Sequence, residues 1–241
     1  MNRPTTVPQG KQPIVFCDFD GTITLSDNIV AIMKHYDPPG CEQIVNDIVS
    51  GAKSIRQGVG EMFALLPSSL KEDITQYVLN TAGIRPGFAE LLKLCREKEI
   101  PFYVTSGGID FFLRPLLAPF DIEEAHIFCN SADFAGDRIE ILWPHPCDEH
   151  CTNDCGMCKT RVIRRFPEDR YFRMLIGDSI TDFEGAKLAD LVFARSHLAT
   201  RCRELGLPHH EYDTFYDVIR VLETLADAGA PESETSQGEN L

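Results

Sequence analysis

The sequence lacks the long apolar run that a membrane-spanning helix requires. No uninterrupted apolar stretch in its 241 residues approaches the roughly 20 residues that cross a bilayer. The first segment, Met1 to Gln12, is polar and contains no apolar core of the kind found in a secretory signal. We therefore expect a cytoplasmic protein that does not bind membranes.

Basic residues are scarce. The chain has 23 Lys and Arg against 37 Asp and Glu, which gives a formal net charge of −14. Proteins that bind nucleic acid usually carry a surplus of basic residues, so we expect no nucleic-acid partner. An anionic substrate would then have to be attracted by a local positive site, and a bound divalent cation would supply one.

No compositional bias departs from that of ordinary globular proteins. Hydrophobic residues make up 43% and charged residues 25% of the chain, which excludes collagen-like, disordered and coiled-coil classes. A chain of this length buries roughly 70–75% of the surface that its unfolded form exposes. A sizeable core is therefore available, and the sequence leaves open whether the protein is a monomer or a homodimer.

Short apolar runs alternate with helical patterns along much of the chain. We expect strands at Pro13–Phe19, Pro101–Thr105, His126–Cys129, Tyr171–Ile176 and Leu191–Ala194. We expect helices at Phe88–Lys98, Asp110–Leu117, Thr160–Phe166, Asp182–Leu188 and Phe215–Leu225. Such alternation predicts an α/β fold with a doubly wound parallel sheet, formed by residues 13–26 and 85–227.

Three segments depart from this alternation. Residues 27–84 show helical periodicity, with a capping-box pattern at Ser54–Gln57, and predict a helical insert after the first strand. Residues 130–158 predict a hairpin over Phe134–Leu142, turning at Gly136-Asp137, followed by a cysteine-rich loop. Residues 228–241 are small, polar and acidic, and predict a disordered tail.

Paired carboxylates follow two of the predicted strands. Asp18 and Asp20 end the first strand ahead of Gly21, and Asp178 and Asp182 follow the strand that ends at Ile176. Two carboxylates two residues apart repel each other unless a divalent cation neutralises them, although a solvated acidic turn is the alternative. Because the carboxyl ends of parallel strands share one edge of the sheet, both pairs are expected at the ligand-binding edge.

A phosphate cradle and a lysine complete the pattern. Ser106-Gly107-Gly108 follows the second strand, and a hydroxyl with exposed backbone N–H groups suits a phosphate. Lys159 stands 19 residues before Asp178, at the start of a predicted helix. A glycine-rich turn or a lone lysine is common by itself, but these elements in this order at matching strand ends are specific.

This order of motifs resembles the haloacid dehalogenase superfamily over about residues 13–225. The resemblance implies a Rossmann-like core with a helical cap inserted after the first strand, and a magnesium-dependent phosphatase that works through an aspartyl-phosphate. It implies that the metal is bound by Asp18, the Asp20 main-chain carbonyl and Asp178, with Asp182 in support. The other implied roles are nucleophile for Asp18, general acid and base for Asp20, phosphate binding for Ser106 and the Gly107 N–H, and charge stabilisation for Lys159.

Within the superfamily, the chain resembles the phosphatases of bacterial methionine salvage. The resemblance rests on Cys17–Thr24, Gly58-Val59-Gly60, Leu65–Glu72, Ile100–Val104, Trp143-Pro144-His145 and the cysteine loop with Lys159. It implies a small-molecule phosphate ester, an enol phosphate with a methylthio tail, as substrate. Asp27, Met62 and Phe63 are candidate substrate-binding residues, and Met62 and Phe63 would suit a thioether, although both could simply pack between cap helices.

Two other classes of function stay open. Phosphoserine phosphatases, which are relatives and the main enzymatic alternative, hold their amino acid with a glutamate where this chain has Asp27 and with a cap arginine. Met62 stands near the place expected for that arginine, although Arg56 is not far away.

A phospho-accepting signalling module of the receiver type uses a similar aspartate, hydroxyl and lysine set, but it is about half this length and has no cap. An idle interaction module is disfavoured because every catalytic position is filled.

Four of the nine cysteines cluster in the spacing Cys147-x3-Cys151-x3-Cys155-x2-Cys158. Four thiols in so short a span could bind structural Zn²⁺ tetrahedrally. Reduced thiols in an ordered loop and redox chemistry are the alternatives. The cluster would then stiffen the loop that carries Lys159, the residue directly after Cys158. The other five cysteines are scattered and are expected in the core.

Overall fold

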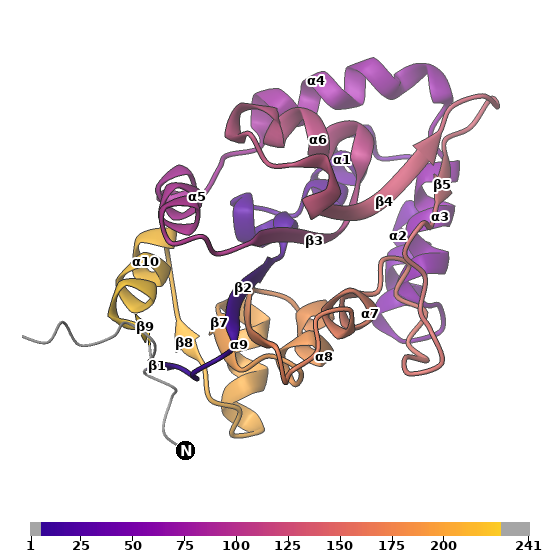
Figure 1. The fold of residues 1–241 in the computed structure, drawn as a ribbon. Helices are drawn as coiled ribbons and strands as arrows, with labels where there is room; N and C mark the ends of the chain where they lie inside the picture. The colour runs from indigo at the N-terminus through magenta and orange to yellow at the C-terminus, as the bar shows by residue number, and fades with distance from the viewer. Residues whose placement is uncertain (1–5, 228–241) are drawn as a thin grey trace, which may run out of the picture.

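The computed structural model describes residues 6–227, so the tail predicted at 228–241 lies outside the described residues. Its centre is a seven-stranded sheet of order β5-β4-β3-β2-β6-β7-β8, in which only β5 pairs antiparallel (Figure 1). The strands are β2 (Gln12–Cys17), β3 (Phe102–Ile109), β4 (Ile127–Asp133), β5 (Glu140–Leu142), β6 (Tyr171–Gly177), β7 (Leu191–Ala194) and β8 (His210–Glu211). The predicted α/β class with a parallel sheet is confirmed.

The sheet is buried on both faces because its central strand alternates between two cores. Along β2, Ile14 and Phe16 enter one hydrophobic cluster, and Val15 and Cys17 enter the other. Helices α5 (Phe88–Glu97), α6 (Asp110–Leu117) and α10 (Phe215–Thr224) contribute to the Val15 side. Helices α7 (Lys159–Arg164), α8 (Phe183–Ala186) and α9 (Ser196–Glu204) contribute to the Ile14 side, which gives a doubly wound arrangement.

Four of the helices between β2 and α5 form the predicted insert. They are α1 (Asn28–Tyr36), α2 (Cys41–Val49), α3 (Ile55–Ala64) and α4 (Lys71–Thr81). The capping box predicted at the start of α3 is present, because Ser54 Oγ accepts from the Gln57 N–H and Gln57 accepts from the Ser54 N–H. In Figure 1 these helices lie along one side of the sheet, where α4 packs on α6 and α3 packs on β5.

The hairpin differs from its prediction in where its first arm lies. Ser131, Ala132 and Asp133 at the end of β4 pair with Leu142, Ile141 and Glu140. Phe134 and the turn around Gly136 therefore belong to the connecting loop rather than to a strand. The strand β4 continues past the edge of the parallel sheet and forms the hairpin itself, so no new strand is needed at Phe134.

Three short strands and helix α9 were not predicted. Strands β1 (Thr6–Val7) and β9 (Ala226–Asp227) form a separate two-stranded parallel pair, and β8 closes one edge of the main sheet. These strands have only two residues each, which is too short for a periodic signal. No helix among residues 6–227 has the length and apolar character that crossing a membrane would demand.

Helix α5 begins at a glycine with a left-handed backbone, which generates a stability prediction. Gly87 has φ +87°, and a Cβ there would lie 2.8 Å from the Tyr216 backbone nitrogen of α10. Gly10 has a similar φ of +84° with no atom within 4 Å of such a Cβ. Gly10→Ala therefore isolates the left-handed strain, roughly 1–2 kcal/mol, whereas Gly87→Ala adds overpacking of about 1–3 kcal/mol. Urea unfolding should show the larger loss for Gly87→Ala, and equal losses would contradict this packing.

Candidate active site

A buried lysine joins two carboxylates that are far apart in the sequence. Lys159 opens α7, and its Nζ lies 2.6 Å from Asp18 Oδ1 and 2.5 Å from Asp182 Oδ1. Asp18 follows β2 and Asp182 follows β6, so the parallel neighbours β2 and β6 bring the two carboxylates to one edge. The three side chains are between 0 and 6% exposed. The structure thus assembles these predicted site residues around one cation.

Burial and charge shift the pKa values of this group in opposing ways. Burial raises the pKa of Asp18 well above its usual range and the Asp182 charge raises it further, while Lys159 lowers it. Burial lowers the pKa of Lys159, but the Asp18 and Asp182 carboxylates outweigh it, so that the pKa is raised and the ammonium stays charged. One cation faces several buried carboxylates, which leaves excess negative charge at the site.

Asp182 has its oxygens occupied by donors of the protein. Its Oδ2 accepts from the backbone N–H groups of Asp178 and Ser179 and from the Ser179 hydroxyl, and its Oδ1 accepts from Lys159. A carboxylate held in this way fixes the direction of Lys159 and the turn after β6. This arrangement agrees with the expectation that Asp182 supports the metal site rather than being one of its main ligands.

Asp178 lies close to the loop that follows β2. A Cβ at Gly21, which has φ +75°, would lie 2.4 Å from Asp178 Oδ2, so only glycine allows this approach. Burial and the Asp182 charge raise the pKa of Asp178 to about 6. Carboxylate oxygens of Asp18, Asp178 and Asp182 lie within 4.8 Å of one another. Oxygen ligands and uncompensated negative charge fit Mg²⁺.

Asp20 is held by one neighbour from the cap. Its Oδ1 accepts from the Asn28 backbone N–H at 3.0 Å and from the Asn28 side-chain amide at 2.6 Å. Burial, followed by the Asp27 charge, raises the pKa of Asp20 to about 7, although the Asn28 bonds oppose this. A carboxyl with such a pKa is divided between its two forms near neutral pH, as a group that both gives and accepts a proton requires.

The glycine-rich turn predicted at Ser106–Gly108 is instead an irregular part of β3, where the register with β4 shifts, and it lies beside Asp20. A Cβ at Gly108 would be 2.7 Å from Asp20 Oδ2 and 3.1 Å from Ser106 Oγ. The Ser106 hydroxyl accepts from the Gly108 N–H, and the Gly107 carbonyl accepts from Asn130 on β4. Ser106 is buried and Gly107 is exposed, so the turn presents its backbone at the sheet edge next to Asp20.

The sequence analysis missed Arg85, which holds the loop after β2 in place. Its buried guanidinium donates to the main-chain carbonyls of Gly21, Thr22 and Thr24, and to that of Asp213. Arg195 adds a bond to the Gly21 carbonyl. No pattern of side-chain types reveals such a role, because every acceptor is a backbone oxygen distant in sequence.

The three predicted substrate-binding residues lie in different surroundings. Asp27 caps α1, where its carboxylate accepts from the Val30 N–H at 2.9 Å. Met62 and Phe63 are buried on α3, within the larger hydrophobic cluster. The Phe63 ring packs edge-on against Phe111 of α6, with centroids 6.3 Å apart.

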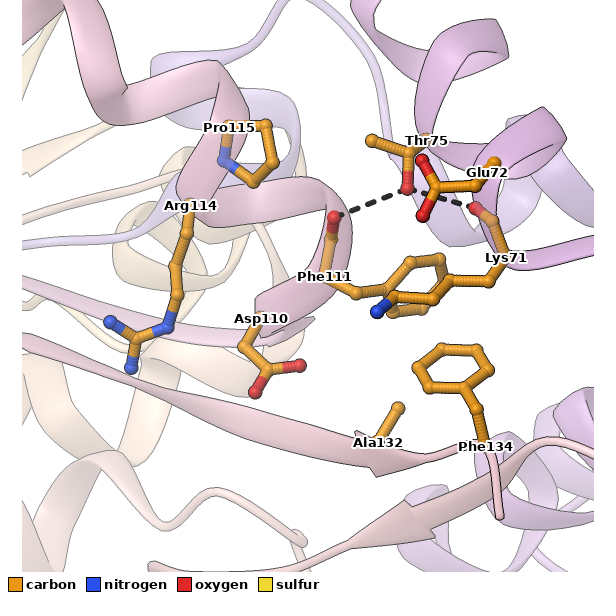
Figure 2. Close-up of a pocket in the computed structure, with 9 residues that line it drawn as sticks. All are labelled: Lys71, Glu72, Thr75, Asp110, Phe111, Arg114, Pro115, Ala132 and Phe134. Atoms are coloured by element: carbon orange, nitrogen blue, oxygen red, sulfur yellow. Dashed lines mark hydrogen bonds between the residues drawn. The ribbon is translucent and has the colours of Figure 1, made fainter. Parts of the chain in front are cut away.

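A groove of about 450 Å³ has Phe111 among its lining residues (Figure 2). It is lined by Lys71, Glu72 and Thr75 of α4, by residues of α6, and by Ala132 and Phe134. The Lys71 ammonium lies 5.0 Å from the centre of the Phe134 ring. None of the carboxylates around Lys159 lines this groove, so the groove is distinct from the candidate active site.

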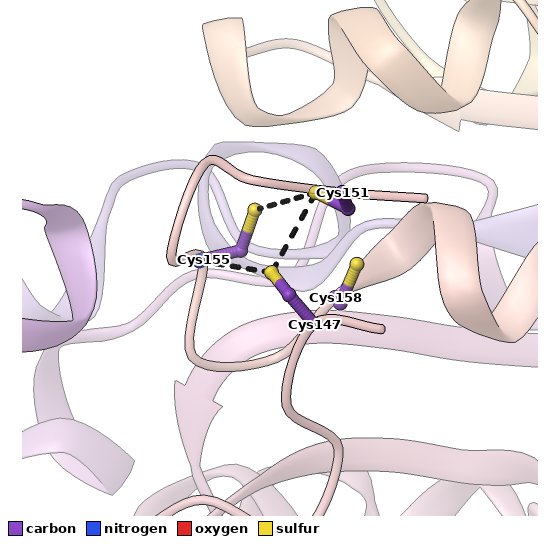
Figure 3. Close-up of side chains that lie close together, drawn as sticks. All are labelled: Cys147, Cys151, Cys155 and Cys158. Carbon is purple, nitrogen blue, oxygen red and sulfur yellow. Dashed lines mark hydrogen bonds between the residues drawn. The ribbon is translucent and has the colours of Figure 1, made fainter. Parts of the chain in front are cut away.

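The four clustered cysteines come together in the loop before α7. Figure 3 shows their sulfurs turned toward a common point, and all four lie within 4.8 Å of one another. The Sγ of Cys151 lies 3.5 Å from that of Cys147 and 3.9 Å from that of Cys155. All nine cysteines of the chain are free thiols, and the five scattered ones are buried, as expected.

Comparisons with known proteins agree with this arrangement. The family model of haloacid dehalogenase-like hydrolases matches residues 15–187. A curated 2-hydroxy-3-keto-5-methylthiopentenyl-1-phosphate phosphatase of Brevibacillus brevis is 56% identical over 88% of this chain and 96% of its own length. A protein of the same name from Geobacillus kaustophilus is 50% identical over 89% of this chain and 97% of its own length.

Solved structures support the fold. A structure of a phospho-aspartyl intermediate analogue of a phosphoserine phosphatase matches with a TM-score of 0.64 and 16% identity, covering 90% of this chain and all of that one. The phosphoserine phosphatase of T. onnurineus gives a TM-score of 0.66 at 16% identity, covering 92% of this chain and 99% of that one. At this identity the likeness establishes the shared fold.

The bonds of Arg85 generate a prediction for both stability and activity. Arg85→Met removes a charged donor from four carbonyls, and hydrogen bonds to charged groups contribute about 1.5–3 kcal/mol each. We expect the free energy of unfolding to fall by about 3 kcal/mol or more and the activity to fall with it, because the loop that carries Asp18 and Asp20 loosens. The control Arg96→Met, at an exposed arginine with one bond to a carbonyl, should change stability by about 0.5 kcal/mol or less. Equal effects in urea unfolding would refute the role of Arg85.

Proposed function

Because the chain belongs to the haloacid dehalogenase-like hydrolase family, we propose that it dephosphorylates 2-hydroxy-3-keto-5-methylthiopentenyl-1-phosphate to the corresponding acireductone in methionine salvage. The proposal rests on one combined observation. A chain about half identical to proteins of that name over nearly their whole length gathers Asp18, Lys159 and Asp178 at one sheet edge. A small-molecule phosphate ester is a substrate that such a site can process.

We assign the first chemical step to the Asp18 carboxylate. Lys159 is bonded to Asp18 Oδ1, and its positive charge offsets the repulsion between this carboxylate and an anionic phosphate. Attack on phosphorus forms an acyl phosphate on Asp18 and breaks the bond to the ester oxygen, which divides one difficult hydrolysis into two easier steps. Asp182 keeps Lys159 directed at Asp18 during this exchange.

Magnesium suits the carboxylates around this centre. Asp18, the Asp20 main-chain carbonyl and Asp178 would hold the ion. Asp182 would support them by its hydrogen bonds to Lys159 and to the turn after β6. Bound there, Mg²⁺ would supply positive charge against the anionic phosphate group. The close approach of Gly21 to Asp178 brings the loop after β2 within reach of the same ion.

Asp20 serves as the proton donor and then as the base. With its pKa at about 7, the Asp20 carboxyl can protonate the departing oxygen and then take a proton from the water that attacks the acyl phosphate. The bonds from Asn28 keep one of its oxygens fixed and leave Oδ2 toward Gly108. An enol oxygen is less basic than a simple alkoxide, so its departure depends less on this proton than the second step does.

The phosphate itself would be bound by the irregular turn at Ser106–Gly108 within β3. The Ser106 hydroxyl and the exposed backbone of Gly107 lie at the same edge as Asp20 and offer hydrogen bonds to phosphoryl oxygens. Asn130 stabilises this turn by donating to the Gly107 carbonyl. The turn therefore keeps its shape without the phosphate.

The cap favours an apolar tail over an amino acid. Phosphoserine would need a cap cation for its carboxylate, yet Arg56 is already paired with Asp154, with its Nε 2.5 Å from the Asp154 Oδ1. Met62 and Phe63 supply apolar surface on the same helix, and Asp27 lies at the start of the cap. We propose that the methylthio tail binds against α3, which requires the buried Met62 and Phe63 to become accessible when the cap shifts.

We propose the cytoplasm as the place of action. All nine cysteines are free thiols, and thiols persist in a reducing compartment. The substrate of the relatives named above is a small metabolite, so no macromolecular partner is needed for turnover.

Phosphate release tests the proposed substrate directly. The enzymatically generated enol phosphate, phosphoserine and p-nitrophenyl phosphate should be compared with and without Mg²⁺. We expect strong preference for the enol phosphate and loss of activity after chelation. Preference for phosphoserine would overturn the assignment of the cap, and turnover of none of the three would overturn the proposed activity.

Asp20→Asn tests the proton-transfer role of Asp20 in the proposed reaction. An amide cannot donate or accept the proton, so kcat should fall roughly 100- to 10,000-fold. The exposed Asp169→Asn is the matched control and should leave kcat unchanged. Steady-state kinetics with the enol phosphate measures both variants, and an Asp20→Asn enzyme with near-normal kcat would exclude Asp20 as the acid and base.

A further inference from the structure

The four sulfurs of the loop before α7 have the spacing of a tetrahedral metal site. Four thiolates at about 2.3 Å from a shared Zn²⁺ lie roughly 3.8 Å from one another. The Sγ atoms of Cys147 and Cys151 are 3.5 Å apart, and those of Cys151 and Cys155 are 3.9 Å apart. Disulfides do not account for this grouping, because a disulfide brings its sulfurs to about 2.05 Å and all four cysteines are free.

A backbone donor and two arginine side chains lie against the loop. The Cys155 backbone N–H donates to the Cys147 Sγ at 3.4 Å. Arg164 of α7 pairs with Asp148, and Arg161 donates to the Pro146 carbonyl, so two cations lie against the loop. Four thiolates around one divalent cation carry a net charge of −2, which Arg161 would partly offset, since Arg164 already pairs with Asp148. A set of metal ligands made only of thiolate sulfur selects zinc or iron over magnesium.

One end of the loop is joined to the catalytic lysine. Cys158 is the N-cap of α7 and directly precedes Lys159. Its backbone N–H donates to the His145 carbonyl at 2.8 Å, which fixes the entry into the helix. The position of Cys158 therefore determines where the Lys159 side chain begins.

The middle of the loop is joined to the cap. Asp154, between Cys151 and Cys155, accepts from the Arg56 Nε and from the Ser54 hydroxyl, and its carbonyl accepts from the Arg56 backbone N–H at 3.3 Å. The Trp143 ring lies beside Gly156 of the same loop. A Cβ at Gly156 would lie 2.6 Å from this ring, and one at Gly60 of α3 would lie 3.5 Å from it. The loop thus contacts the first turns of α3 through charge and through packing.

From these contacts we propose that Cys147, Cys151, Cys155 and Cys158 bind one structural Zn²⁺, and that the ion makes this loop a clasp between cap helix α3 and the start of α7. Without the ion, the loop is a twelve-residue connection with no helix or strand of its own. With it, four points of the loop are fixed to one centre. The clasp then holds Asp154 against Arg56 and holds Cys158 ahead of Lys159.

Metal content tests the site itself. Protein purified without chelators should contain about one zinc per chain, and replacement by Co²⁺ should give the visible absorption of tetrahedral thiolate coordination. Cys151→Ser/Cys155→Ser should lose the zinc and this absorption, whereas Cys41→Ala/Cys202→Ala, which removes two buried thiols outside the loop, should retain both. Wild-type protein with no zinc and no cobalt absorption overturns the site, and one iron per chain in place of zinc overturns the choice of metal.

Amide hydrogen exchange tests the clasp. Zinc would be removed by a chelator, Mg²⁺ would then be restored, and exchange would be compared with that of the zinc-loaded protein. The Arg56 amide, which is bonded to the Asp154 carbonyl, should exchange faster after zinc removal. The amides of α10 serve as the internal control. Unchanged exchange at Arg56 despite complete zinc loss overturns the clasp, whatever the phosphatase assays show about the substrate.

Discussion

The ion pairs of Lys159 with Asp18 and Asp182 are the interaction on which the rest of the structure depends. All three side chains are buried, and one ammonium cannot neutralise both carboxylates and Asp178 as well. Removing one partner of a buried pair leaves an uncompensated charge, which is strongly destabilising. The surrounding loops are therefore built to hold these groups together, and the excess of negative charge suits a metal ion and a phosphate-binding chemistry.

Hydrogen bonds from side chains to the backbone keep the site in shape. Arg85 and Arg195 hold the carbonyls of the loop after β2, and Asn130 holds that of Gly107 in β3. Asp182 gathers the N–H groups after β6. Each of the three segments that supply the site is thus fixed by a side chain bonded to its backbone, so the site is largely formed before a ligand binds.

Local motifs made the parallel fold and the central site residues predictable. Asp18 and Asp178 stand directly after apolar strands, Asp20 and Asp182 follow in the next turn, and Ser106 lies in the last part of β3. The topology of a parallel sheet then brings them to one edge. Arg85 and the pairing of Arg56 with Asp154 could not be predicted, because their partners are backbone carbonyls or a carboxylate 98 residues away. Helix α9 escaped prediction because its sequence, SHLATRCRE, is mostly polar and buries only three residues. Strand β4 was predicted too short because its last residues leave the parallel sheet to form the hairpin.

The covalent role of Asp18 is the central claim, and trapping the phosphorylated enzyme tests it most directly. A single turnover with labelled substrate, quenched in acid and digested, should place the phosphoryl label on the peptide that contains Asp18. Asp18→Asn should carry no label, although its fold is retained in far-ultraviolet circular dichroism. Label on another residue, or equal labelling of Asp18→Asn, would contradict the account.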